Sequence, residues 1–282
     1  MTDAALIAIE PTIRGVAFVT CLGLLALAER TRPCRGDARP AWRQLVNLGM
    51  VGIDTLLTRA LLPLVGIVLA AHLRTGGTNG VGLFAMLRWP EPIEIVAAAL
   101  ALDAIIYFQH RLLHRVPILW RAHRVHHSDV AFDVTLGVRF HPFEILISQA
   151  LKLAAITLLG AAPLAVLLFE VVLQSGALFT HVDVALPARF ERMLRWLVVT
   201  PSLHRVHHSV ERDETDSNFG FSVVWWDRLF GTYRAAPRRP EATMPVGVPE
   251  FRDQEAQGLV ALLAQPFVPT PVPPGAEVSH AR

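Results

Sequence analysis

The region from residue 145 to residue 179 constrains the fold more than any other part of the chain. Its 35 residues are predominantly apolar, and Gly160 to Pro163 interrupt them near the middle. Each half can form a helix of about 15 to 17 residues, and glycine and proline at the break are typical of a turn. The region therefore predicts a hairpin of two membrane helices, whose two ends lie on the same face of the bilayer.

Two copies of one hexapeptide flank this hairpin. His123 to Ser128 and His204 to Ser209 both read His-Arg-Val-His-His-Ser. Because residues i, i+3 and i+4 lie on one face of a helix, we expect each copy to point three imidazole rings at one spot. The hairpin brings both copies to the same side of the membrane, so the apolar pattern and the histidine pattern agree.

Ten of the twelve histidines lie between residues 110 and 208. Imidazole is the commonest nitrogen ligand for Zn, Cu, Fe and Ni. We therefore predict one site that holds two metal ions, with about five ligands each or fewer where a position stays open. His72, at a membrane edge, and His280, in the C-terminal tail, are left out. The predicted metal ligands are His110, His114, His123, His126, His127, His141, His181, His204, His207 and His208.

The composition indicates an integral membrane protein. Hydrophobic residues make up 52% of the chain, charged residues 18%, and the mean hydropathy is +0.41. These values are too apolar for an ordinary soluble domain. The net charge of +2 and the clustering of the arginines give no sign of nucleic acid as a partner. Cys21 and Cys34 do not form the pattern of a disulfide framework or a thiolate metal site, so we expect the compartment facing the site to be reducing.

The N-terminal apolar run predicts an uncleaved membrane anchor. Gly15 to Ala28 carry no charge, and the run extends back to Ala4 if Glu10 and Arg14 pair as i, i+4 neighbours. Its end at Ala28 resembles a signal-peptide cleavage site, but arginines that follow directly oppose translocation. They mark the cytoplasmic side and place the N-terminus outside. These arginines are Arg30, Arg32, Arg35, Arg39 and Arg43.

Two further spans complete the predicted bundle. Leu45 to Leu73 cross outward, Arg74 to Pro92 form a connector with turn signals at Gly76–Gly77 and Asn79–Gly80, and Ile93 to Phe108 return. The fold class is therefore an all-α, multi-pass membrane bundle of about four to five membrane helices. A cytoplasmic, histidine-rich cap holds the dimetal site.

We divide the chain into three parts. Residues 1–44 form the anchor and the arginine-rich loop, residues 45–234 the membrane catalytic domain, and residues 235–282 a Pro-rich tail. We expect one short helix in the tail, from Phe251 to Ala264, and disorder from Pro269 onward. Pro187 to Val199 are amphipathic and predict a helix at the membrane interface.

Other site types fit the residues poorly. A ferritin-like di-iron site needs two Glu-x-x-His motifs, and the chain has one, Glu277 to His280. HExxH, GxSxG and Walker motifs do not occur. Ten clustered rings exceed what a bis-histidine haem requires, and structural zinc sites favour thiolates.

The histidine series resembles the membrane fatty acid hydroxylase/sterol desaturase superfamily. The likeness covers about Trp42 to Tyr233, and the isolated His181 is followed by Val182-Asp183 where the family pattern has Ser-Asn. The motifs that carry it are His110-x3-His114, His123-x2-His126-His127, Arg139-Phe140-His141-Pro142-x-Glu144, His181, Val199-Thr200-Pro201, His204-x2-His207-His208, Glu214 to Asn218 and Trp226 to Tyr233.

This resemblance implies a non-haem di-iron centre that uses O2 and external electrons to hydroxylate or desaturate a fatty acyl, sterol or carotenoid-like lipid. Zinc can take the place of iron in purified protein. The electron donor would be a separate cytochrome b5-like or ferredoxin-like protein. A non-redox membrane metal protein, either a zinc-dependent lipid hydrolase or a metal carrier, stays open as the alternative function.

Polar residues near the histidines are candidates to orient the rings and balance the charge. Asp103 shares a helical stripe with His110 and His114, although it can equally pair with another polar group in the bundle. Asp216 and Asn218 can instead cap a local turn. Arg111, Arg115, Arg121 and Arg124 either contact a lipid headgroup or mark the cytoplasmic side. The candidates for the second shell are Asp103, Glu144, Asp183, Asp216 and Asn218.

Overall fold

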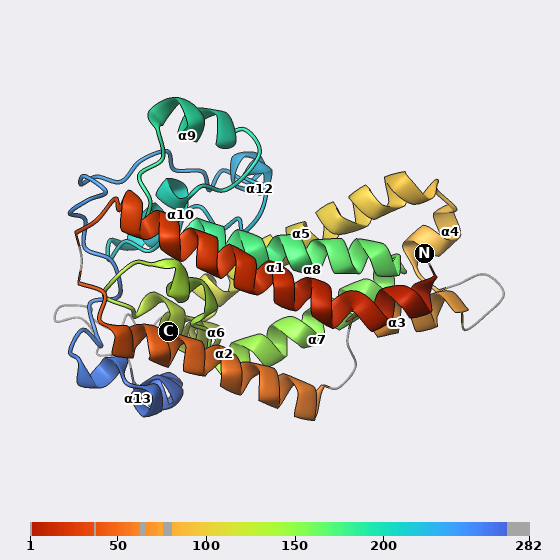
Figure 1. Cartoon of the computed structure of the whole chain (residues 1–282), viewed down its shortest axis with the longest axis horizontal. Coiled ribbons are helices and arrows are strands. Elements are labelled where there is room, and N and C mark those ends of the chain that lie inside the picture. The colour runs from red at the N-terminus through yellow and green to blue at the C-terminus, as the bar shows by residue number, and fades with distance from the viewer. Residues whose placement is uncertain (1, 37, 63–65, 76–80, 270–282) are drawn as a thin grey trace, which may run out of the picture.

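The computed structural model describes residues 2–36, 38–62, 66–75 and 81–269. Five long helices run side by side, and most of the shorter elements gather at the end of the bundle away from the start of α1, whereas the two short helices between residues 66 and 87 lie near that start (Figure 1). Within the described residues extended pairing is limited to isolated bridges, so the predicted all-α class is confirmed. The long helices are α1 (Asp3–Thr31), α2 (Ala41–Leu61), α5 (Glu91–Arg115), α7 (Pro142–Leu159) and α8 (Pro163–His181).

Four segments are long and apolar enough to cross a membrane, as predicted for a multi-pass protein. They are Asp3–Thr31, Ala41–Arg74, Pro142–Leu159 and Pro163–His181. The second includes α2 and α3 (Gly66–Thr75). α5, which contains the predicted span from Ile93 to Phe108, is not among the four, although it packs against α8 inside the bundle.

The predicted hairpin is confirmed in α7 and α8. Gly160 ends α7 in the left-handed conformation, with φ at 63°, and Pro163 begins α8 at a position where its missing N–H costs nothing. A Cβ atom on Gly160 would lie 2.2 Å from the carbonyl oxygen of Val81. Glycine therefore fits this turn both by conformation and by space.

α1 extends back to Asp3, and the two charged residues that interrupt its apolar sequence, Glu10 and Arg14, are paired. Arg14 contacts Glu10 at 2.9 Å, as predicted, and also Glu170 of α8 at 2.7 Å. Burying a carboxylate and a guanidinium together avoids the cost of an isolated charge in the bundle. This contact fixes α1 against α8.

Small and branched apolar residues fill the space between α3, α5, α7 and α8. Ala98 and Leu102 of α5 meet Ala165, Val166 and Phe169 of α8, all buried. Alanine at such positions lets helix backbones approach closely. The histidine-bearing ends of α5 and α8 are thereby held beside each other.

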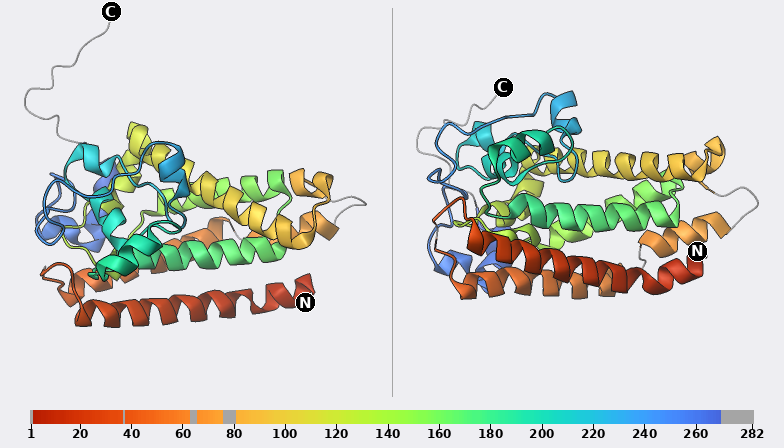
Figure 2. Two further views of the ribbon diagram at one scale, coloured as in Figure 1. Left: turned by 90° about the horizontal axis from the view of Figure 1, so that it is seen from above. Right: turned by 45° about the horizontal axis from the view of Figure 1, so that its top comes forward.

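Most of the short elements form a cap over the histidine-bearing end of the bundle (Figure 2). The predicted interfacial helix is present as α9, shorter than expected, with Phe190 48% and Met193 61% exposed. The predicted connector contains an unpredicted helix, α4 (Leu83–Leu87), while its signals at 76–80 lie outside the described residues. The cap elements are α6 (Pro117–His127), η1 (Val134–Val138), α9 (Ala188–Leu194), α10 (Pro201–His207), α11 (Arg212–Thr215), α12 (Trp225–Leu229), η2 (Glu255–Gln257), α13 (Leu259–Ala264) and η3 (Gln265–Phe267).

The first part of the predicted tail is packed into the cap. Leu262 of α13 is buried against Met50 and Val125, and Val246 is buried against Phe132. Residues 270–282, where we expect disorder, lie outside the described residues. The described part of the segment beyond residue 235 therefore belongs to the same folded unit as the bundle.

Candidate metal centre

The histidines sit where four helices end or turn over the bundle. His110 and His114 occupy the last turns of α5, and α6 follows directly because Pro117 starts a new helix after a one-residue break at Val116. His181 is the last residue of α8. α10 carries His204 and His207, and its N-cap Thr200 accepts from the Leu203 amide at 3.4 Å.

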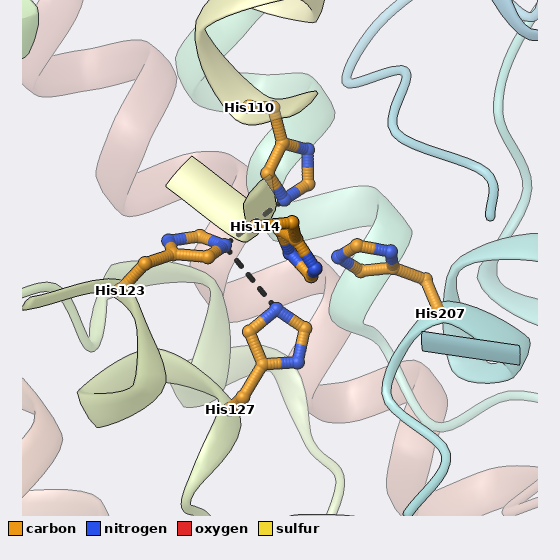
Figure 3. Close-up of side chains that lie close together, drawn as sticks. All are labelled: His110, His114, His123, His127 and His207. Carbon is orange, nitrogen blue, oxygen red and sulfur yellow. Dashed lines mark hydrogen bonds between the residues drawn. The ribbon is translucent and has the colours of Figure 1, made fainter. Parts of the chain in front are cut away.

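Nine of the ten predicted ligands form two buried groups. In each group the ring nitrogens that face one another all lie within 4.8 Å. Figure 3 shows the five rings of the first group converging from three helices. We call the groups site A, which is His110, His114, His123, His127 and His207, and site B, which is His126, His181, His204 and His208.

The two hexapeptides divide their rings between the sites, which corrects the expectation that each copy points at one spot. The first copy gives His123 and His127 to site A and His126 to site B. The second gives His204 and His208 to site B and His207 to site A. On a helix, residue i+4 is rotated about 40° from residue i, and residue i+3 is rotated about 60° in the opposite direction. The rings at i+3 and i+4 of each hexapeptide therefore point to different sites.

The two sites are neighbours. The rings of His127 and His208 stack with centroids 4.5 Å apart, and those of His204 and His207 with centroids 5.0 Å apart. Each of these contacts joins a site A ring to a site B ring. This arrangement suits two metal ions in one centre.

Backbone carbonyl oxygens fix the orientation of four rings. A carbonyl oxygen can only accept, so the Nδ1 atom facing it carries the ring proton and Nε2 keeps its lone pair. The four bonds are His110 to Phe219 at 2.7 Å, His126 to Arg139 at 3.3 Å, His181 to Ala177 at 2.6 Å and His207 to Ser217 at 2.7 Å.

The Nε2 atoms then approach one another without protons between them. His181 Nε2 lies 3.1 Å from His126 Nε2, and His110 Nε2 lies 3.0 Å from His123 Nε2. Nitrogens about 2.1 Å from a metal ion and at right angles are about 3.0 Å apart, so these distances fit a shared cation. The buried Nε2 atoms of His114 and His207 have no hydrogen-bond partner. The donor set therefore fits a metal centre.

Burial favours the neutral form of five of these rings. It lowers the pKa of His207 to about 3 and the pKa of His126, His127, His204 and His208 well below 6.5. A charged imidazole cannot bind a metal ion, because its second nitrogen is protonated. The rings are thus in the form that a metal ion requires.

Two of the predicted carboxylates contact ligand rings. Glu144 Oε1 accepts from His123 Nδ1 at 2.9 Å, and Asp216 Oδ1 accepts from His114 Nδ1 at 3.2 Å. Glu144 is buried and Asp216 is 38% exposed at its side chain. A carboxylate at this position fixes the ring tautomer and makes the ligand more basic.

The other three predicted polar residues contact no histidine. Asp103 accepts from Trp226 Nε1 at 2.8 Å. Asp183 pairs with Arg39 and with Arg205, the latter at 3.2 Å. Asp183 therefore ties the arginine-rich loop to the second hexapeptide and does not reach a ring.

Asn218 shapes the loop that holds two rings. Its side chain donates to the carbonyl oxygens of Leu203 and Arg234, both at 2.9 Å, and its φ of 49° is left-handed. It stands between Ser217 and Phe219, whose carbonyl oxygens accept from His207 and His110. Asn218 therefore holds the backbone whose carbonyl oxygens orient His207 and His110.

His141 lies outside both sites. It is the N-cap of α7, where its Nδ1 accepts from the Phe143 amide at 3.2 Å. Its Nε2 donates to the carbonyl oxygen of Leu263 at 3.2 Å. Both ring nitrogens are thus engaged away from the metal ligands.

Sequence reasoning missed the residues that hold the ligand-bearing backbone. Buried Asp227 accepts from the amides of Phe219 at 2.7 Å and Gly220 at 2.9 Å, and from Thr232 Oγ1 at 2.7 Å. It secures the loop that orients His110 and His207. The block from Trp226 to Tyr233 contains Asp227 and Thr232, but its pattern does not reveal this contact.

A buried charge network supports the other side of the centre. Arg139, whose carbonyl oxygen receives His126, donates through its side chain to Val125 O and Ser128 Oγ, both at 2.9 Å. Arg43 of α2 contacts Asp129 at 2.7 Å. These buried charges are paired, which offsets their desolvation. The network fixes the end of the first hexapeptide to α2.

Arg124 is buried, whereas a contact with a lipid headgroup would require an exposed side chain. Its exposed fraction is 2%, and it donates to the carbonyl oxygens of Gln265 and Val268. Its guanidinium also lies 5.0 Å from the ring centroid of Phe251. Arg124 therefore anchors the segment that follows α13.

Helices able to cross a membrane, together with two buried histidine groups, define a histidine-rich membrane metalloprotein. The family model described as fatty acid hydroxylase matches residues 95–232, which contain all ten predicted ligands. The chain belongs to the fatty acid hydroxylase family. No solved structure matches it.

Several curated proteins are similar to this chain. Ornithine lipid hydroxylase OlsE of Rhizobium tropici is 32% identical over 265 residues, covering 89% of this chain and 75% of that protein. Alkylglycerol monooxygenase of Homo sapiens is 30% identical over 156 residues, or 53% of this chain and 32% of that protein. Cholesterol 25-hydroxylase of Rattus norvegicus is 26% identical over 199 residues, which cover 64% of this chain and 63% of that protein. The chain thus spans about a third of the human monooxygenase's length.

Proposed function

We propose that this protein is a membrane-bound non-haem di-iron hydroxylase that uses O2 and external electrons to insert oxygen into a membrane lipid. The observation that carries the proposal is the convergence of nine buried imidazoles on two adjacent sites. Iron is the metal we assign, because family membership and an all-nitrogen donor set favour redox chemistry over a closed structural zinc site. Two iron ions would supply O2 activation, which amino-acid side chains cannot perform.

The residues of this chain hold and insulate the metal ions. We assign the five rings of site A to one iron and the four rings of site B to the other, and we leave out His141. Glu144 and Asp216 fix the tautomers of His123 and His114 from outside. The complete burial of the rings excludes bulk water, which protects a reactive oxidant from side reactions.

The arginine-rich loop supports a cytoplasmic position for the metal centre. Arg39 of that loop is ion-paired with Asp183, two residues after the site B ligand His181. The loop and the centre therefore lie at the same end of the bundle, and positively charged loops stay on the cytoplasmic side. A separate electron donor in that compartment could reach the centre.

We propose hydroxylation over desaturation, and an ornithine-containing lipid as the first substrate to test. The relatives are named as hydroxylases and monooxygenases, and the one that covers most of this chain is an ornithine lipid hydroxylase. An acyl chain that stays in the bilayer would present its carbon atoms to the cap from the ends of the long helices.

The test is expression in a bacterium that makes ornithine lipid without hydroxylating it, followed by growth under 18O2 and mass spectrometry of the lipids. We expect a lipid that contains one 18O atom and that is absent when His207 is replaced by alanine. Loss of two hydrogen atoms without added oxygen would indicate desaturation. Lipid cleavage that proceeds without O2 would instead favour the zinc-dependent hydrolase.

A further inference from the structure

Trp120 connects site A with the protein surface. Its ring centroid lies 5.0 Å from that of His114, 5.3 Å from that of His127 and 6.2 Å from that of His123. The three histidines are buried, whereas Trp120 is partly exposed. One indole ring therefore touches three ligands of one metal site and also reaches the protein surface.

Arg212 covers the outer part of this tryptophan. Its guanidinium lies 5.0 Å from the Trp120 ring centroid, close enough for a cation–π contact. It also donates to Asp216 Oδ2 at 2.7 Å and to the carbonyl oxygen of His114 at 2.9 Å. The Arg212 side chain is 56% exposed. Arg212 thus contacts the backbone of the ligand His114, the carboxylate of Asp216 and the partly exposed indole of Trp120.

Three arginines flank Trp120, two of them in the sequence and one in space. Arg115 ends α5 and is exposed, Arg121 follows Trp120 in α6, and Arg212 lies over the ring. Asp216 is the carboxylate bonded to Arg212. We call these five residues, Arg115, Trp120, Arg121, Arg212 and Asp216, the Trp120 surface; it carries three positive charges and one negative charge.

The carboxylates on either side of Arg212 do not reverse this balance. Asp213 is paired with Arg234 and Arg238, both at 2.7 Å. Glu211 lies 4.0 Å from Arg239. The surface next to site A is therefore complementary to a negatively charged partner.

We propose that the Trp120 surface is the docking site of a small acidic electron-carrier protein, and that the Trp120 indole lies on the electron path into site A. The proposal rests on the proposed function, in which a C–H bond, O2, two electrons and two protons give a C–OH group and water. Each docking event oxidises the carrier by one electron and reduces the metal centre by one. Charge complementarity steers the encounter, and the ring contacts shorten the distance through which the electron passes.

The docking test measures binding of an oxidised plant-type [2Fe–2S] ferredoxin, which is acidic, to the zinc-loaded protein in nanodiscs. Arg212→Glu and Arg121→Glu should each raise the Kd for ferredoxin by about fivefold or more at low salt. The difference in Kd between each variant and the wild type should shrink at high salt. The matched control is Arg228→Glu, because Arg228 lies 5.4 Å over another tryptophan, Trp196, that touches no histidine ring. The control should change the Kd less than about twofold.

The electron-path test measures reoxidation of reduced ferredoxin by the iron-loaded protein in stopped flow. At saturating ferredoxin, Trp120→Phe should slow the transfer, whereas Trp196→Phe should not. If Arg212→Glu, Arg121→Glu and Arg228→Glu weaken ferredoxin binding equally, the proposed docking site is wrong. If Trp120→Phe accepts electrons at the wild-type rate, the proposed electron path is wrong. Iron that dithionite reduces but ferredoxin does not would contradict only this proposal. Iron that dithionite cannot reduce would contradict the proposed function itself.

Discussion

The Nε2 atoms of His126 and His181 lie 3.1 Å apart, and both rings donate from Nδ1 to a backbone carbonyl oxygen. Neither Nε2 atom therefore has a proton to offer, and two lone pairs face each other in a buried space. Such an arrangement is unfavourable unless a cation lies between the nitrogens. The backbone of α8 and of the segment after η1 thus prepares the rings for a metal ion before one binds.

Replacement of a ligand should remove a metal ion, whereas replacement of His141 should not. His207 belongs to site A, and its Nε2 is buried without a partner, while His141 is engaged by Phe143 and Leu263. We expect His207→Ala to lose at least one metal ion per chain and His141→Ala to keep the wild-type content. Metal quantification on purified protein checks both. Equal losses in the two variants would place His141 among the ligands.

The carboxylate behind His123 should strengthen metal binding. Glu144→Gln removes the negative charge that faces His123 Nδ1, and we expect the metal affinity to fall about tenfold or more. Asp103→Asn is the matched control, because Asp103 is also buried on a long helix but bonds Trp226. Competition with a chelator measures both affinities. A similar fall for Asp103→Asn would mean that general polarity, not the contact with His123, sets the affinity.

Asp227 should stabilise the loop that orients His110 and His207. Asp227→Ala leaves the buried amides of Phe219 and Gly220 without their acceptor, so the free energy of unfolding should fall by about 3 kcal/mol. Asp213→Ala, which removes an exposed ion pair with Arg234, should leave the melting temperature unchanged. Thermal unfolding in detergent compares them, and an unchanged melting temperature for Asp227→Ala would contradict the assigned role.

The metal-free protein should lose stability as the pH falls below about 6.5. Burial lowers the pKa of His207 from 6.5 to about 3 and that of His204 and His208 in the same direction, so the unfolded chain takes up protons first. Each such ring costs about 1.4 kcal/mol of unfolding free energy per pH unit in that range. Melting temperatures of the apoprotein between pH 7.5 and 5 test this, and a flat profile would show that the rings are not buried without metal.

The apolar pattern and the histidine spacing were sufficient to predict the hairpin and most of the candidate ligands. Gly160 and Pro163 interrupt an apolar region too long for one span, so the break was visible in the residues themselves. The division of each hexapeptide between two sites was not visible, because helical spacing gives a face and not the position of a neighbouring helix. His123 belongs to site A and His126 to site B because of the positions of the histidines on α8 and α10, which the sequence does not show.

The acceptors that orient the rings could not be predicted for a different reason. Ser217 and Phe219 act through backbone carbonyl oxygens, which every residue has. His141 looks like a ligand by residue type, yet at the start of α7 its ring satisfies a helix amide instead. The ordered segment after residue 235 was predicted as a tail from its prolines, because its contacts with Arg124 and Arg139 join residues far apart in the chain.

The most direct test of the central claim is Mössbauer spectroscopy, with metal quantification, on protein purified from cells grown on 57Fe. We expect two irons per chain and a spin-coupled diferric signal that is lost both in His207→Ala, which removes a ligand of site A, and in His126→Ala, which removes one of site B. Zinc as the sole metal, with no iron recovered after anaerobic reconstitution, would contradict the account.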